Sequence, residues 1–129
     1  MEVLSDEPGG VMAEYMLLLY ADEDEGRDRF AEMPSWQEVT ESLREAGALV
    51  DNAMLHSPDS ATTVRVRAGE TELTDGPFAT TKEFLAGYYV LECADLDEAL
   101  AHAARLPIVR YGSVEVRPIA PGRGRGGRS

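Results

Sequence analysis

The chain contains little cysteine, little basic charge and no long apolar run. Cys93 is the only cysteine among 129 residues, which excludes an internal disulfide and favours a reducing compartment. No stretch approaches the roughly 20 apolar residues that span a bilayer. Residues 1–13 include acidic side chains and no basic one, so they do not resemble a secretory signal. We therefore expect a cytoplasmic protein that does not enter the membrane.

Basic residues are outnumbered two to one, because 12 Lys and Arg stand against 24 Asp and Glu, for a formal net charge of −12. All acidic residues precede position 121, whereas Arg123, Arg125 and Arg128 follow it. An acidic body repels phosphate backbones, so we predict that the domain does not bind nucleic acid. The role of the Arg-Gly tail is left open, since such segments are either solvated or bind RNA and acidic partners.

The length of the chain suits a single domain with its own apolar core. Translation can start at Met1 or at Met12, and the sequence alone does not decide between them. Compositional breaks then divide the chain into three predicted parts: a disordered N-terminal extension over residues 1–13, a domain over 14–120, and a disordered Gly/Arg tail over 121–129.

Hydrophobic periodicity predicts the order β-α-β, then a hairpin, then β-α-β. Two residue pairs have the spacing of a helix-capping box: Ser35 with Glu38, and Asp95 with Glu98. Each pair predicts the start of a helix. Gly47 is placed to end the first helix. In the second helix an apolar face is expected from Leu96, Ala99, Leu100, Ala103 and Leu106. Strands are predicted at 15–20, 49–56, 62–67, 71–74, 84–92 and 113–119.

This order of elements predicts an α+β fold, namely a ferredoxin-like split βαβ sandwich with a hairpin insertion. Its central strands would be residues 15–20 and 84–92, which are apolar on both faces instead of alternating. Two helices cover only one face of the sheet, so the other face needs a partner. A second copy of the chain is the simplest partner, and we expect a homodimer.

Two long segments carry a family resemblance: "YMLLLYADED" near the start, and "VRVRAGETELTDGPFATTKEFLAGYYVLECADLDEALAHAARLP" later in the chain. Over about residues 14–119 the chain resembles the YCII-related, or DGPF-domain, family. The resemblance implies a dimeric α+β barrel, in agreement with the argument from the central strands. Thr80 stands where the family usually has Glu, so no role proposed for that acid carries over.

The functional content of the resemblance is narrow. Relatives in the broader group have a His-Asp active site, and some act on chlorinated or hydroxylated aromatic compounds. The histidine of that site lies on the first helix, but the first predicted helix here, "SWQEVTESLREAG", contains no histidine. That active site therefore does not transfer to this chain. DGPF proteins are also linked to bacterial sigma factors, which offers a regulatory alternative.

Three residues are candidates for acid-base catalysis. Asp75 opens the turn Asp75-Gly76-Pro77-Phe78, where it can build the corner while Phe78 fills the edge of the core. We expect its carboxylate to reach a cleft in addition to shaping this turn. His56 ends a strand and is the only histidine placed to act as a general base. Tyr88 adds a hydroxyl from the strongest predicted strand.

The ligand-binding candidates are Arg65, Tyr89, Arg110 and Tyr111. Tyr88 and Tyr89 must point to opposite faces of the sheet, although the sequence does not say which faces the helices. The sets 84, 86, 88, 90 and 85, 87, 89, 91 are expected on the two faces. Neither histidine belongs to a cluster with cysteine or carboxylate spacing, so we predict no metal and no cofactor.

These observations favour a YCII-related dimeric protein of unproven activity, with a small ligand bound in a cleft near the sheet face. A first alternative is a small cofactor-independent enzyme that uses acid-base residues on small aromatic or carboxylate substrates, in a cleft between the sheet and its partner. A second alternative is a non-catalytic partner in sigma-factor-linked regulation. The sequence contains no phosphate-binding loop and no nucleophile elbow that would point to another class.

Overall fold

The computed structural model describes residues 12–22, 29–79 and 82–121, and the predicted order of elements is confirmed over these ranges. Most of the predicted N-terminal extension and tail lies outside the described residues. The elements in chain order are β1 (Ala13–Ala21), α1 (Arg29–Glu45), β2 (Leu49–Met54), η2 (Pro58–Ser60), β3 (Thr62–Arg67), β4 (Glu70–Asp75), β5 (Phe84–Cys93), α2 (Leu96–Ala103), η3 (Pro107–Arg110) and β6 (Ser113–Pro118).

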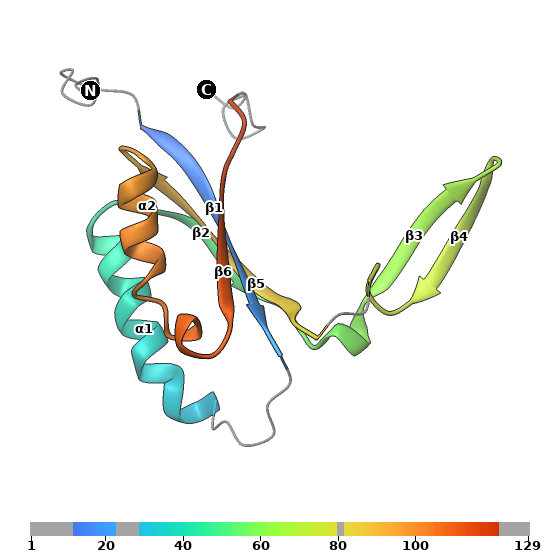
Figure 1. The fold of residues 1–129 in the computed structure, drawn as a ribbon, viewed down its shortest axis with the longest axis horizontal. Coiled ribbons are helices and arrows are strands. Elements are labelled where there is room, and N and C mark those ends of the chain that lie inside the picture. Colours follow the sequence, from blue (N-terminus) through green and yellow to red (C-terminus); the bar gives the residue numbers. More distant parts are fainter. Residues whose placement is uncertain (1–11, 23–28, 80–81, 122–129) are drawn as a thin grey trace.

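Four strands form one antiparallel sheet in the order β2-β5-β1-β6, so the two doubly apolar strands are central, as predicted. Both helices lie on the same face of this sheet (Figure 1). The chain is therefore an α+β fold with a four-stranded antiparallel sheet, two helices and a hairpin. Neither helix within the described ranges combines the length and the apolarity needed to cross a bilayer.

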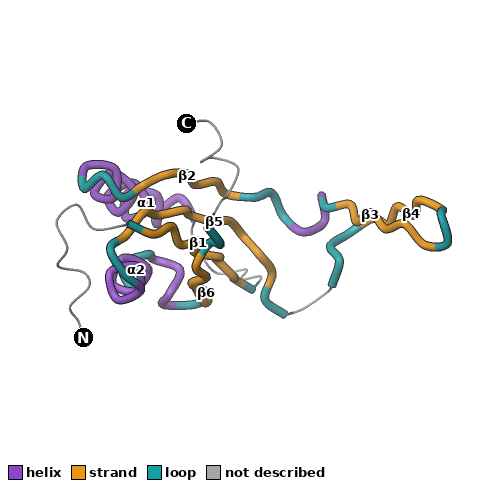
Figure 2. The backbone as a smooth tube through the Cα atoms, turned by 90° about the horizontal axis from the view of Figure 1, so that it is seen from above, coloured by secondary structure: helices purple, strands orange, loops and turns teal. Residues whose placement is uncertain are grey.

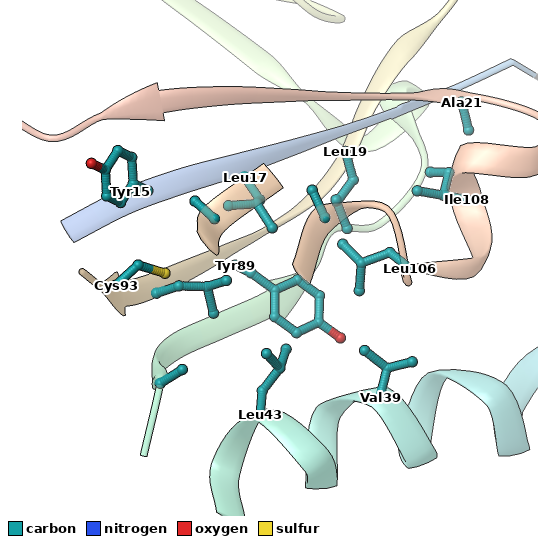
Figure 3. Close-up of a cluster of buried hydrophobic side chains, with 14 residues drawn as sticks. Tyr15, Leu17, Leu19, Ala21, Val39, Leu43, Tyr89, Cys93, Leu106 and Ile108 are labelled. Carbon is teal, nitrogen blue, oxygen red and sulfur yellow. The ribbon is translucent and has the colours of Figure 1, made fainter. Parts of the chain in front are cut away.

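The core lies between the sheet and the two helices. Alternate side chains of β1 enter it, and Leu17 and Leu19 are completely buried. Val39 and Leu43 of α1 close the cluster from the helix side (Figure 3). The apolar face predicted for α2 is only partly confirmed: Ala99, Ala103 and Leu106 are buried, whereas Leu96 and Leu100 are each 45% exposed.

Local signals set two helix ends and mislead at a third. Asp95 caps α2, because its carboxylate accepts a 2.9 Å hydrogen bond from the Glu98 amide. Gly47, with φ of +74°, follows the end of α1 in the left-handed conformation that ends helices. The prediction that Ser35 caps α1 is wrong, since this helix begins at Arg29 and includes Pro34. Arg, Ala, Glu and Met ahead of Pro34 are strong helix formers, and they extend the helix even though proline removes a backbone donor and crowds the carbonyl of the preceding turn.

Strands β3 and β4 form a separate two-stranded sheet, which we call the arm (residues 62–75). The arm projects away from the four-stranded sheet in both perpendicular views (Figures 1 and 2). Its tight turn uses Ala68 and Gly69, both with positive φ, as two-residue hairpins of right-handed twist require. The DGPF turn follows at the base of the arm, so Phe78 is 78% exposed. The expectation that Phe78 fills the core edge is therefore wrong.

The arm has one apolar side and one charged side. Val64 pairs with Leu73 on the apolar side, next to Val66, and these three side chains are 59–69% exposed. Opposite charges face each other across the strands on the other side, in the pairs Arg65 with Glu72 and Arg67 with Glu70. With Phe78, the apolar residues of the arm and its base are the four most exposed large hydrophobic side chains described.

The face of the four-stranded sheet that points away from the helices, which we call the outer face, is apolar at its centre. Leu18 lies opposite Tyr88, and Met16 lies opposite Val90, along the two central strands. Val90 is only 3% exposed although it does not belong to the core cluster on the helix side. Charged residues of the edge strands flank this centre, Asp51 on β2 and Glu115 and Arg117 on β6.

Candidate functional site

A cavity of about 470 Å³ lies on the helix side of the sheet, between α1 and strands β1, β2 and β5, and reaches the η3 segment. Aliphatic and aromatic side chains supply most of its wall, with Leu19, Ala21 and Ile108 at the sheet and η3 side. Its volume falls within the range of sites that hold small organic ligands. The cavity is therefore the candidate functional site of the described structure.

Helix α1 supplies one wall of the cavity through residues that recur at helical spacing. Trp36, Thr40 and Arg44 are spaced four residues apart, and residues with this spacing lie next to one another on one face of a helix. Their neighbours Val39 and Leu43 belong to the core instead. Helix α1 thus presents two adjacent rows of side chains to the sheet. The row of Val39 and Leu43 packs in the core, and the mixed row of Trp36, Thr40 and Arg44 lines the cavity.

A β-bulge on β5 provides part of the space. Leu19 pairs with Gly87 and Tyr20 pairs with Leu85, so Ala86 is an extra residue without a partner on β1. The bulge turns Ala86 toward the core side and into the cavity wall. The strict alternation expected for 84–91 is therefore wrong at this point. The small side chain of Ala86 lines the cavity, whereas Gly87 does not line it and has no room for a side chain, since a Cβ there would stand 2.6 Å from the Ala53 backbone oxygen.

Tyr89 is the polar centre of the cavity wall. Its ring is 99% buried and stacks on Trp36, with centroids 6.3 Å apart and an interplanar angle of 13°. Its hydroxyl points toward α1 (Figure 3) and shares a 2.7 Å hydrogen bond with the Thr40 hydroxyl. Burial raises the pKa of Tyr89, while hydrogen bonds from Thr40 and Asn52 oppose that rise. The hydroxyl is accordingly neutral at physiological pH.

Tyr111 and Glu32 form a second polar group of the cavity. Tyr111 follows η3, and its hydroxyl donates a 2.8 Å hydrogen bond to Glu32 Oε1 of α1. Both residues are half-buried and line the cavity. Another charged pair, Glu41 with Arg44, also lines the wall, but both of its side chains are more than half exposed. The inner charge of the cavity is therefore the Glu32 carboxylate.

The structure brings two of the predicted site residues together. Tyr89 and Tyr111 both line the cavity, and Tyr89 is the member of its pair that faces the helices. Tyr88 points to the outer face, where its hydroxyl donates to Asp51 Oδ2 at 3.3 Å. The nearby Asp51 carboxylate raises the pKa of Tyr88.

The other predicted residues lie apart from the cavity. His56 follows β2 and Arg110 ends η3, and both are exposed. Arg65 lies on the arm with its guanidinium carbon 5.8 Å from the ring centre of Phe78. Asp75 is exposed at the base of the arm, where its neighbour Gly76 donates a 2.7 Å backbone hydrogen bond to Ala61. The catalytic roles considered for Asp75 and His56 therefore stay predictions.

Sequence reasoning missed the α1 wall and its partners. Trp36, Thr40, Glu32 and Asn52 are not among the predicted site residues. The signal available in the sequence is the four-residue spacing of Trp36, Thr40 and Arg44. Thr40 and Arg44 each directly follow a core residue of the same helix. Asn52 gave a weaker signal, as a polar residue on the strand face that turns inward.

The described lining of the cavity has a narrow set of polar groups. Its described lining contains no histidine, cysteine or lysine, and its polar groups are hydroxyls, amides, carboxylates and one guanidinium. Tyr89 cannot serve as a base at neutral pH, because its proton is retained. Stacked aromatic rings and nearby hydrogen-bonding groups instead suit the recognition of a flat, largely apolar molecule.

Cys93 is a buried thiol outside the cavity, and its titration gives a stability prediction. Burial, and then the carboxylates of Glu98, Asp95 and Glu92, raise its pKa from 9.0 to about 11. Folding therefore retains the thiol proton, and stability falls as pH rises above 9. We expect urea denaturation to show that wild type loses roughly 1 kcal/mol more than Cys93→Ala between pH 8 and pH 10. Equal losses in the two proteins would contradict the assigned burial of the thiol.

The chain is similar in sequence to known proteins. The YCII-related domain matches residues 13–123 of the chain. An uncharacterised protein of Rhizobium meliloti (strain 1021) is 51% identical over 78 residues, which are 59% of this chain. The match covers 63% of that relative, so the chain spans less than two thirds of its length.

Proposed function

The chain belongs to the YCII-related domain family, and we propose that it is a homodimeric protein that binds a small, largely apolar ligand in the cavity between α1 and the sheet. The observation that carries the ligand proposal is the stacked Trp36–Tyr89 pair at a cavity of about 470 Å³. A buried hydroxyl beside two aromatic rings can orient a flat ligand while the apolar wall excludes water.

The described cavity lining contains no histidine, cysteine or lysine, and its inner carboxylate, Glu32, accepts a hydrogen bond from Tyr111, which favours binding over acid-base catalysis. The polar groups at hand are Thr40, Asn52, Gln37 and the Tyr111–Glu32 pair. Hydroxyls and amides of this kind fix the orientation of a ligand and discriminate between related molecules. The proposal therefore assigns recognition, and no reaction, to this cavity.

A thermal-shift screen with small aromatic compounds tests the ligand proposal. A true ligand at 100 times its Kd adds roughly 2.7 kcal/mol to the free energy of unfolding, and the melting temperature rises accordingly. Ala86→Leu places a larger side chain into the cavity wall and is expected to abolish the shift while the fold is retained. Ala101→Leu, at an exposed position of α2 outside the cavity, is the matched control and should respond like wild type.

If a ligand raised the melting temperature of Ala86→Leu as much as that of wild type, its binding site would lie outside this cavity. The absence of any shift across the aromatic compounds would contradict the proposal itself. Far-UV circular dichroism of both variants establishes that each retains the fold before the comparison is made.

The homodimer proposal is supported by the outer face. Met16, Leu18 and Tyr88 are partly exposed at its centre, next to the buried Val90, and within the described ranges both helices lie on the other face of the sheet. Contiguous apolar surface of this kind is typical of interfaces. In a two-fold dimer the same patch serves both subunits, so one surface provides its own partner.

The arm supports the same proposal from a different observation. An isolated two-stranded hairpin has marginal stability in water unless further strands or a packed layer cover it. The apolar side of the arm, Val64, Val66 and Leu73, is not covered by any described part of its own chain. In a homodimer the second subunit covers the apolar side of the arm, and no other protein is needed for this role.

A further inference from the structure

We propose that the ligand of the α1–sheet cavity carries a positive charge, as an amine or a quaternary ammonium group attached to an apolar or aromatic body. This inference rests on the proposed ligand-binding function and adds the chemical class of the ligand. The juxtaposition that carries it is the Glu32 carboxylate beside the rings of Trp36, Tyr89 and Tyr111 at one cavity.

The charges of the described lining do not balance. Glu32, Glu41 and Arg44 all line the cavity, and Arg44 is bonded to Glu41. That pair lies at the exposed rim, with side-chain exposures of 58% for Arg44 and 56% for Glu41. One negative charge is left, on the half-buried Glu32, and a cationic group on the ligand would neutralise it.

The Glu32 carboxylate is also held in position. Tyr111 donates to Oε1 at 2.8 Å, which fixes the orientation of the carboxylate and leaves Oε2 able to accept a further donor. A protonated amine offers N–H donors to such an oxygen, and the resulting charge-assisted hydrogen bonds are stronger than neutral ones. A quaternary ammonium group has no N–H and would interact with the carboxylate through its charge alone. A ligand carboxylate at the same place would instead meet a like charge.

The aromatic rings favour the same class of ligand. Trp36 is only partly buried, and the face of its indole ring carries the negative part of the ring quadrupole, which makes tryptophan the strongest of the aromatic side chains in attracting cations. Tyr89 is 1% exposed and supports Trp36 by stacking on it. Tyr111 adds a third ring next to Glu32. The net charge of −12 further raises the local concentration of cations over that of anions.

Three probes of similar size separate charge from shape: 2-phenylethylamine, 2-phenylethanol and phenylacetate, titrated by calorimetry at pH 7.5 and physiological salt. We expect the amine to bind at least about tenfold more tightly than the alcohol, and phenylacetate to bind most weakly. Glu32→Gln keeps an oxygen that accepts from Tyr111 but removes the charge. It should bring the amine to within about threefold of the alcohol and leave the alcohol affinity nearly unchanged.

Glu38→Gln is the matched control, because Glu38 is an exposed residue of α1 that does not line the cavity, and it should keep the wild-type preference. Equal affinity of the three probes, or tightest binding of phenylacetate, would overturn the charge assignment and leave ligand binding intact. An amine preference that survives in Glu32→Gln would overturn it as well. Failure of all three probes to bind would count against both the charge assignment and the proposed function.

Discussion

Leu18→Glu is expected to convert the proposed dimer into monomers. Leu18 lies on the central strand β1, opposite Tyr88 on one side and Glu115 on the other, at the middle of the outer face. In a two-fold interface the new carboxylate enters twice, and each copy is buried beside Glu115 of its own sheet, which carries the same charge. We expect the dimer dissociation constant to rise at least about 100-fold, equivalent to roughly 3 kcal/mol, by sedimentation equilibrium.

Leu100→Glu is the matched control for this experiment. Leu100 is an apolar residue of α2 on the helix side of the sheet, is 45% exposed, and receives the same charge change. The control should remain dimeric, and circular dichroism should show the same fold in both variants. A wild-type protein that sediments as a folded monomer at micromolar concentration, or a Leu18→Glu protein that stays dimeric, would contradict the assignment of the interface.

Gly112→Ala is expected to destabilise the fold by about 3 kcal/mol or more. Gly112 lies between η3 and β6, and a methyl group there would stand 2.1 Å from the backbone oxygen of Tyr20 and 3.1 Å from Ile108 Cγ1. The clash is with backbone, so it cannot be relieved by rotation of a side chain. Either β1 or the η3 turn must shift, and that turn precedes the Tyr111–Glu32 hydrogen bond. Urea denaturation measures the loss in the free energy of unfolding.

Gly47→Ala separates crowding from backbone strain in this experiment. Gly47 has a φ of +74° and open space around the position of a Cβ, so its substitution strains the backbone without a clash. The expected cost is about 1–2 kcal/mol, the penalty of a left-handed L-residue. If Gly112→Ala cost no more than Gly47→Ala, the close approach between Gly112 and Tyr20 would not be a property of the folded protein.

The fold was predictable because its signals are local and agree with one another. Doubly apolar runs identified β1 and β5 as central strands, and Asp95 and Gly47 set helix ends through their own side-chain and backbone chemistry. The start of α1 was not predictable in the same way. Ser35 has the right spacing for a cap, yet favourable residues before Pro34 extend the helix by more than a turn.

The site was less predictable, because the decisive features depend on tertiary placement. Alternation showed that Tyr88 and Tyr89 face opposite ways, but only packing against α1 assigns Tyr89 to the helix side. The arm has the period of an ordinary hairpin, and nothing in that period says that it leaves the sheet. Asp75 and Phe78 lie at the base of the arm and do not line the cavity. A conspicuous sequence motif therefore lies away from the candidate site.

The bulge at Ala86 separates the lining of the cavity from the pairing of the two central strands. Across β1, the neighbours of Ala86 keep their partners, Gly87 with Leu19 and Leu85 with Tyr20, while Ala86 itself pairs with none. Its side chain lines the cavity, and its backbone takes no part in the pairing of β5 with β1. Under the proposed function, a different side chain at this position would change the size of the ligand that fits, while the pairing of β1 with β5 stayed the same.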